Sequence, residues 1–294
     1  MTATPWPGLL FAAGGAVAFS GKAIIIKLAY RYGVDAVTLL ALRMLFALPT
    51  FVALAWWAGR GKPALVWRDK LAVLGLGFCG YYLASTLDFL GLAYISASLE
   101  RLILYLNPTI VLLLGAFMLA RPVRARQLAA LSVSYLGALV VFGQELSFEG
   151  SQVALGAALV FGSALFYAVY LLYSGEVLKR VGSLRLTGLA TSVACVLCIL
   201  QFVLLRAPGS AFAVAPQVLW LSLLNATACT FAPVLMTMLA IERVGPAVTS
   251  QTGMVGPMST IVMGVLILGE PFTAWVALGT ALVLLGVWLL ARSR

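Results

Sequence analysis

Six ionisable side chains lie inside long apolar stretches of the sequence, where charged groups are expensive. They are Lys22, Lys27, Arg43, Asp88, Glu100 and Arg101. A charge at the centre of a lipid bilayer costs at least ~2.5–3.5 kcal/mol, so such residues usually face a protein interior, pair with one another or mark a transport pathway. If the apolar stretches cross a membrane, these residues are the first candidates for chemistry.

Four of them have the types and spacing of a charge cluster. Asp88 and Glu100 lie near the adjacent ends of two apolar stretches that a short connection joins. Arg43 lies about two helical turns from the same side of another stretch. Glu100 with Arg43, or Asp88 with Arg101, would then form structural ion pairs. The alternative is that Glu100 or Asp88 exchanges a proton during transport.

The two lysines have different expectations. Lys22 lies nearest the middle of its stretch, where its amine either faces a substrate carboxylate or holds an ion pair. Lys27 is closer to the end, so we expect its flexible side chain to carry the amine to the membrane surface.

Aromatic, methionine and polar side chains in the middle of other stretches are candidates for the walls of a substrate cavity, because such residues hold apolar ligands and orient polar groups. Each has packing as its alternative role. The candidates are Tyr81, Tyr82, Tyr105, Asn107, Tyr167, Tyr170, Asn225, Thr230, Gln251, Met254 and Met258. Pro108 and Pro257 also lie in mid-stretch, where proline frees a backbone carbonyl and kinks a helix.

The elements that must position these residues are membrane-spanning helices. Of the 294 residues, 63% are hydrophobic and 10% are charged, whereas soluble domains are about 25% charged. A spanning helix needs about 20 apolar residues, and the chain divides into ten such stretches. They are 8–30, 36–58, 71–93, 96–119, 125–143, 151–173, 184–206, 216–239, 245–268 and 273–292.

The basic residues between these stretches predict their orientation. One side would carry Arg60, Lys62, Arg68, Lys70, Arg121, Arg124, Arg126, Lys179, Arg180, Arg185, Arg243, Arg292 and Arg294, and the other only Arg31 and Arg206. Positive residues concentrate on the cytoplasmic side. We therefore expect a multi-pass protein of the cell (inner) membrane with both termini in the cytoplasm.

An internal repeat divides the chain into two halves. Pro108, Gly115, Pro122 and Gly137 recur, 149 positions later, as Pro257, Gly264, Pro271 and Gly286. The predicted units are 8–143 and 151–292, each with five spans. Because five is odd, the second unit enters the membrane from the opposite side. The expected fold is all-α and integral to the membrane, with ten transmembrane helices as two inverted five-helix repeats. Such repeats bind substrates between their halves and work by alternating access.

The motifs within each half resemble the EamA repeat of the drug/metabolite transporter superfamily. The resemblance covers nearly the whole chain and rests on residues 19–27, 41–43, 94–99, 106–108, 245–247, 255–257 and 268–271. It implies ten helices and the export of small metabolites. Within the superfamily, the chain looks most like exporters of amino acids, including aromatic ones. It departs from the generic repeat in carrying charges at Lys22, Asp88, Glu100 and Arg101, and in having Arg121 where the second copy has Glu270.

Other functional classes find little support in the residues. The chain has no His, which excludes Ser–His and zinc-protease chemistry, and it has no phosphate-binding loop. An intramembrane enzyme, a passive channel and an exporter of drugs or other amphipathic metabolites stay as alternatives. The net charge is +10, but the basic residues lie in short loops between the apolar stretches and form no nucleic-acid-binding patch. Cys195 and Cys198 are expected to be buried thiols. We expect no cofactor and no metal, a small-molecule substrate and the lipid bilayer as partners, and a monomer as sufficient, with the oligomeric state open.

Overall fold

The apolar stretches fold as helices, which satisfy every backbone polar group internally and can therefore cross lipid. The computed structural model describes residues 6–119, 124–149, 152–211, 213–253 and 255–292. Among these residues, eight helical segments are long and apolar enough to span a membrane, and Val255–Leu268 and Ala274–Leu290 are shorter apolar helices. The chain is an all-helical membrane protein with ten transmembrane helices in two inverted five-helix repeats.

The bounds of the helices follow the predicted spans closely, and several spans consist of more than one element. The first half contains α1 (Trp6–Tyr30), α2 (Ala36–Gly59), α3 (Trp67–Gly77), the π-helix η1 (Phe78–Leu83), α4 (Ala84–Leu92), α5 (Ala97–Leu104), α6 (Asn107–Leu119) and α7 (Ala125–Glu149). The second contains α8 (Gln152–Val181), α9 (Ser183–Leu205), the 3₁₀ turn η2 (Pro208–Ala211), α10 (Pro216–Ala226), the π-helices η3 (Thr227–Phe231) and η4 (Gly264–Leu268), α11 (Ala232–Thr252), α12 (Val255–Met263) and α13 (Ala274–Arg292).

The repeat is visible in the irregular elements as well as in the sequence. η1 begins at Phe78 and η3 at Thr227, which are 149 positions apart, and each interrupts the third span of its half. π-helical turns are rare and occur frequently at functional sites. Two such turns at matching positions therefore direct attention to the third spans.

One predicted boundary is wrong. We expected a break near residues 239–245, but α11 continues as a helix to Thr252 and the ninth apolar helix begins at Val255. The polar residues Glu242 and Arg243 lie within this helix. Glu and Arg favour helix, so their charge marks the end of an apolar span without ending the helix.

The helices are interrupted near the two mid-span prolines. α5 ends at Leu104 and α6 begins at Asn107, which places Pro108 in the first turn of a new helix. Pro257 is likewise the third residue of α12. Proline is tolerated in a first turn, where its missing N–H has no intrahelical partner to lose. The predicted kinks are therefore discontinuities between helices.

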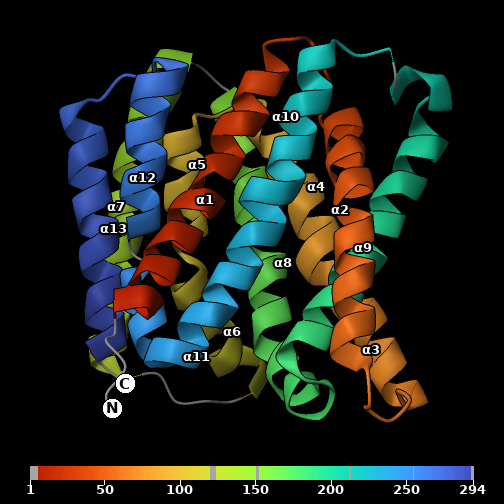
Figure 1. Ribbon diagram of the computed structural model, residues 1–294. Coiled ribbons are helices and arrows are strands. Elements are labelled where there is room, and N and C mark those ends of the chain that lie inside the picture. Colours follow the sequence, from red (N-terminus) through yellow and green to blue (C-terminus); the bar gives the residue numbers. More distant parts are fainter. Residues whose placement is uncertain (1–5, 120–123, 150–151, 212, 254, 293–294) are drawn as a thin grey trace.

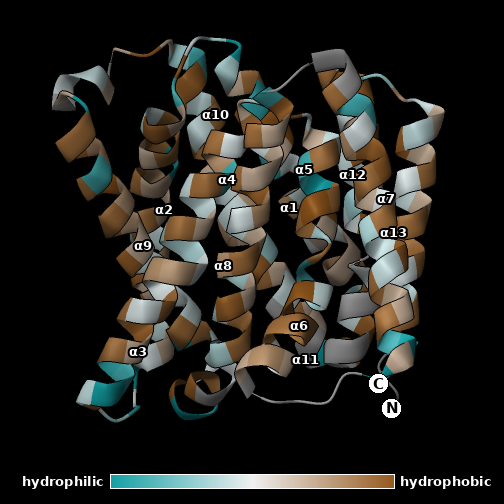
Figure 2. Ribbon diagram, turned by 180° about the vertical axis from the view of Figure 1, so that it is seen from behind, coloured by the Kyte–Doolittle hydropathy of each residue, from teal (hydrophilic) through white to brown (hydrophobic). Residues whose placement is uncertain are grey.

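The bundle has α7 and α13 at one edge and α2 and α9 at the other, with α1, α4, α5 and α8 between them (Figure 1). α7 and α13 approach closely at Gly137, where the absence of a side chain leaves room for the partner backbone: an added Cβ would lie only 2.6 Å from the carbonyl oxygen of Gly279. Such small-residue contacts are typical of membrane helix pairs. Large apolar side chains face outward instead, with Phe117 90% exposed, and Figure 2 shows hydrophobic residues along most of the length of the helices.

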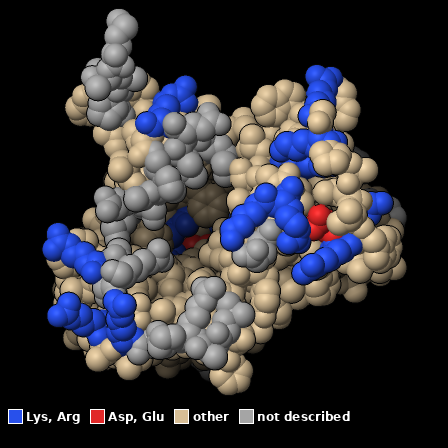
Figure 3. All heavy atoms as spheres, turned by 90° about the horizontal axis from the view of Figure 1, so that it is seen from below, with Lys and Arg blue, Asp and Glu red and all other residues tan. Residues whose placement is uncertain are grey.

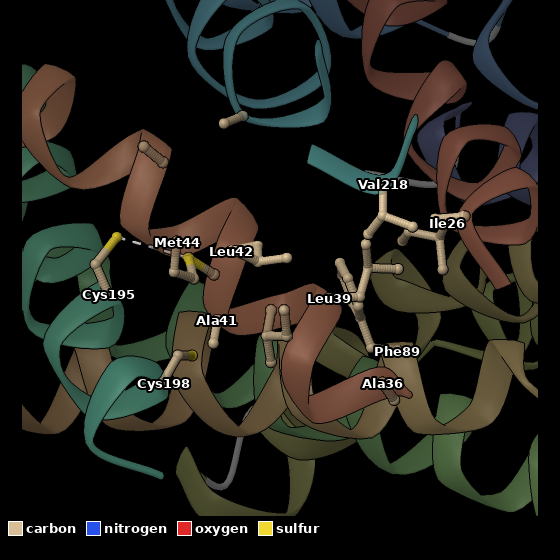
Figure 4. Packing of buried hydrophobic residues seen from close by; sticks show 14 of the residues in the cluster. Ile26, Ala36, Leu39, Ala41, Leu42, Met44, Phe89, Cys195, Cys198 and Val218 are labelled. Carbon is tan, nitrogen blue, oxygen red and sulfur yellow. Dashed lines mark hydrogen bonds between the residues drawn. The ribbon is translucent and has the colours of Figure 1, made fainter. Parts of the chain in front are cut away.

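The largest packed core surrounds α2. Figure 4 shows Cys195 and Cys198 of α9 facing α2, where the Cys195 thiol donates to Met44 Sδ at 3.6 Å. Phe89 of α4 and Ile26 of α1 pack elsewhere against α2. Both thiols are at most 1% exposed, and their C-x-x-C spacing places them in this core. The core fixes α1, α2 and α4 relative to one another.

Candidate functional site

Lys22 of α1 is the centre of a buried charge cluster. Its Nζ lies 2.6 Å from Asp88 Oδ2 on α4 and 3.1 Å from Glu100 Oε1 on α5. The three residues are 6%, 3% and 0% exposed, respectively. One amine therefore joins three helices of the first repeat through two buried ion pairs.

This arrangement corrects the predicted pairing. We expected Glu100 to pair with Arg43, or Asp88 with Arg101. Among the described residues, however, the basic group within 4 Å of each of these two carboxylates is Lys22. Three carboxylate oxygens, namely Asp88 Oδ1 and both oxygens of Glu100, are buried without a hydrogen-bond partner among the described residues, although Glu100 Oε1 lies within ion-pair distance of Lys22.

The two arginines are held by neutral groups. Arg43 Nε donates to Thr230 Oγ1 at 3.1 Å, and its guanidinium lies 5.3 Å from the centre of the Phe89 ring. Arg101 Nε donates to Thr260 Oγ1 at 2.9 Å, and its Nη2 donates to the Phe19 carbonyl at 3.3 Å. Both arginines are buried. Together with Lys22, three cations face two carboxylates.

Local sequence explains how these side chains reach their positions. Ser96 caps α5 by accepting a hydrogen bond from the Leu99 amide, so Glu100 and Arg101 fall within the first two turns. Adjacent helix residues point in different directions. Glu100 therefore meets α1, while Arg101 reaches α12. On η3, the Thr230 hydroxyl donates to the Asn225 carbonyl at 2.8 Å, five residues back, and accepts from Arg43.

The two repeats contact each other at the end of the bundle beyond the cluster. We call this end the distal face. The opposite end, where α1 begins and α13 ends, is called the terminal face. Glu270 accepts hydrogen bonds from the backbone amides of Ala97 and Ser98 at 2.7 and 3.2 Å, and from the Ser98 hydroxyl at 2.7 Å. Its carboxylate also gains from the partial positive charge at the N-terminus of α5. A residue of the second repeat thus holds the start of a first-repeat helix.

Further contacts tie the distal face together. Arg31 donates to the Leu268 carbonyl at 2.6 Å, and Glu145 of α7 accepts from the amide and the hydroxyl of Ser96. Lys27 donates to the Leu92 and Ile95 carbonyls at 3.3 and 2.9 Å, so its amine extends to the connection between α4 and α5 at the distal face. A pocket of about 540 Å³ lies among these residues.

The terminal face is hollowed as well. Figure 3 shows a central depression in this face, and atoms of Lys or Arg and of Asp or Glu are visible in its depth. The basic residues around the rim are more numerous than the acidic ones in this view.

The predicted cavity residues fall into separate groups. Tyr81 and Tyr170 share a hydrogen bond at 3.2 Å, and Tyr167 stacks on Tyr170 with ring centres 5.6 Å apart. This tyrosine cluster packs among α3, α8 and α9. Tyr82 packs against Phe78.

The remaining cavity candidates surround the breaks between helices or lie elsewhere. Tyr105 donates to the Gly253 carbonyl at 2.8 Å, and Asn107 donates to the Leu104 carbonyl at 2.8 Å. Asn225 is 1% exposed, whereas Met258 is 46% exposed. Met254 and the side chain of Gln251 lie outside the described residues.

Sequence reasoning missed the neutral partners of the cluster. Phe19, Phe89 and Thr260 contact its cations, but their types are ordinary in membrane helices and nothing in the sequence marks them. Thr230, by contrast, was predicted as a cavity residue, and the structure places it against Arg43.

Ten helices in inverted repeats, with a buried charge cluster between the two ends of the bundle, define a class of membrane transport proteins. The EamA-like transporter family matches the sequence twice, over residues 6–143 and 154–292. The chain belongs to the EamA-like transporter family, and it is a membrane transporter rather than an enzyme.

Curated relatives and solved structures are similar to the chain. "Uncharacterized transporter YcbK" of Bacillus subtilis (strain 168) is 30% identical over 282 residues, which cover 90% of this chain and 86% of that protein. An "Uncharacterized transporter" of Archaeoglobus fulgidus is 25% identical over 230 residues, covering 78% and 80% of the two chains. A crystal structure with 18% identity superposes with a TM-score of 0.63 over 97% of this chain and 98% of the other, which supports the fold.

Proposed function

We propose that this transporter exports amino acids, including aromatic or other apolar ones, or related small metabolites across the cell (inner) membrane by alternating access. The units that exchange conformations are residues 8–143 and 151–292. Both termini lie in the cytoplasm, because loops on that side carry most of the Lys and Arg residues. The terminal face is then cytoplasmic, and the hollow in Figure 3 opens toward the cell interior.

The observation that carries the proposal is the position of the buried cluster between two unlike faces. Lys22, Asp88 and Glu100 are almost fully buried in helices of the first repeat. Beyond them, Glu270 of the second repeat closes the distal face by binding α5. A substrate that enters the hollow would meet the cluster and would leave after these contacts separate.

The cluster also offers a route for coupling. Asp88 Oδ1 and Glu100 Oε2 accept no hydrogen bond from the described residues. Either oxygen could therefore take up a proton without breaking an existing hydrogen bond. Intramembrane carboxylates serve as proton carriers in many transporters. We propose that Glu100 or Asp88 exchanges a proton as the substrate leaves, with Lys22 stabilising the deprotonated form.

Flux into liposomes containing the purified protein tests the proposal. We expect saturable entry of phenylalanine or leucine, faster than into protein-free liposomes, and a change in rate when a pH gradient is imposed. Lys22→Met should abolish the acceleration, whereas Lys27→Met, which removes an amine bound only to carbonyls in the described residues, should retain it. If no amino acid moves faster, the substrate proposal is wrong, and if the pH gradient has no effect, the coupling role of Glu100 and Asp88 is wrong.

A further inference from the structure

The buried cluster has an excess of positive charge that the described residues do not compensate. Lys22 is shared by Asp88 and Glu100. Arg43 and Arg101 have no carboxylate within 4 Å in the described part of the chain and rely on threonine hydroxyls and a backbone carbonyl. With every group ionised, the five side chains carry a net charge of +1.

Arg43 has the most unused hydrogen-bonding capacity. Its Nε binds Thr230, and its two terminal nitrogens donate no hydrogen bond to the described residues. These two nitrogens form the fork that binds a carboxylate through two parallel hydrogen bonds. The guanidinium also lies over the Phe89 ring, with its Cζ 5.3 Å from the ring centre.

The three cations converge on one region of the bundle. Lys22 and Arg101 both lie over the Phe19 ring of α1, 5.8 and 5.4 Å from its centre, and Arg43 binds Thr230 of η3. Helix α1 packs closely on η3, since a Cβ added to Gly21 would lie 3.0 Å from the sulfur of Cys229. The cations therefore act on the same buried volume around α1 and η3, even though they come from three different helices.

We propose, resting on the transport function proposed above, that the site selects organic anions of charge −1 and recognises them by a carboxylate, with Arg43 as the carboxylate receptor. Arg101, fixed by Thr260, is the other cation without a carboxylate within 4 Å among the described residues. A carboxylate without an ammonium group brings the buried site to zero net charge. A zwitterion leaves it at +1, and a cationic amphipath raises it to +2.

The unpartnered oxygens of Asp88 and Glu100 favour a substrate with an ammonium group, because that group could donate hydrogen bonds to them. An uncompensated buried charge costs more than one unmade hydrogen bond. The net charge of the site therefore determines which substrates bind, and an ammonium group on the substrate is not required. On this reasoning, cationic drugs are poor substrates.

Ligand-induced stabilisation of the purified protein tests this inference separately from transport, because at a fixed ligand concentration a ligand that binds the folded protein more tightly raises the unfolding temperature more. The probes share one apolar group and differ in charge: 3-phenylpropionate, phenylalanine and phenylalaninamide, and likewise 4-methylpentanoate, leucine and leucinamide. We expect affinity to fall in that order in both series, by roughly ten- to a hundredfold between the carboxylate and the amide.

Arg43→Gln should remove the difference within each series, while Arg43→Lys should retain part of it. Arg31→Gln, which removes one positive charge at the distal face, should leave the order unchanged. Equal stabilisation by carboxylate and amide, tighter binding of the amino acid than of the carboxylate, or no stabilisation by either carboxylate would overturn the inference. Preference for the carboxylate without flux in liposomes would support the site and contradict only the transport proposal.

Discussion

Replacing Lys22 by methionine should destabilise the protein strongly. The substitution keeps much of the side-chain volume but removes the amine that lies 2.6 Å from Asp88 and 3.1 Å from Glu100. Removing one partner of a buried ion pair typically costs about 3–5 kcal/mol, because the remaining charge is left uncompensated. At roughly 2–4 °C per kcal/mol, as for domains of 150–250 residues, the unfolding temperature should fall by about 6–20 °C.

Thermal unfolding in a mild detergent, followed by tryptophan fluorescence, measures this effect. The control is Lys27→Met, which breaks hydrogen bonds to two neutral carbonyls but leaves no unpaired buried charge behind, and should therefore cost less. The triple variant Lys22→Met, Asp88→Asn, Glu100→Gln removes all three charges and should recover most of the lost stability. A Lys22→Met variant as stable as the Lys27→Met control, or a triple variant no more stable than the single one, would refute the reasoning.

Three other predictions concern the elements around the site. Glu270→Gln should speed amide hydrogen exchange in α5 roughly ten- to a hundredfold, since charged hydrogen bonds at its N-terminus are lost; unchanged exchange would show that Glu270 does not hold this helix. Asp35→Ala should cost about 1 kcal/mol at pH 7, because Asp35 caps α2. Partial burial acts to raise the pKa of Asp35, but hydrogen bonds from Thr38 and Arg206 hold it below its ordinary value of 3.8. The stabilisation by Asp35 is therefore complete above pH 3.8 and should disappear as the pH falls through the lower folded-state pKa. A stability difference between Asp35→Ala and the unchanged protein that did not vary with pH would contradict this role. Gly279→Leu should destabilise the α7–α13 contact by at least about 1–3 kcal/mol, whereas Gly143→Leu, where an added Cβ meets nothing, should change unfolding little; equal effects would mean that close packing of α7 and α13 is unimportant.

The ten helices could be predicted from the sequence because each apolar span must satisfy its own backbone in lipid. The bend of the chain between the eighth and ninth spans could not. Glu242 and Arg243 indicate where an apolar span ends, but the helix that carries them continues to Thr252. Helix ends depend on backbone geometry and capping, which hydropathy does not report.

The charged members of the candidate site could also be identified, since charges inside apolar helices are rare. Their pairing could not, because Lys22 and Asp88 are 66 positions apart and only the packing of α1 against α4 brings them together. Partners such as Thr260 and Phe19 have no distinctive residue type. Glu270 was noticed as a departure between the repeats, but its contact with α5 spans more than 170 positions.

Counterflow in proteoliposomes tests the central claim most directly, namely that one buried site is exposed to one side of the membrane at a time. Labelled 3-phenylpropionate or phenylalanine is loaded inside, and the same unlabelled compound is added outside. Alternating access predicts that the outside compound accelerates the exit of label, and that Lys22→Met abolishes this acceleration. Exit of label that is insensitive to compound on the opposite side would contradict alternating access and indicate a passive channel.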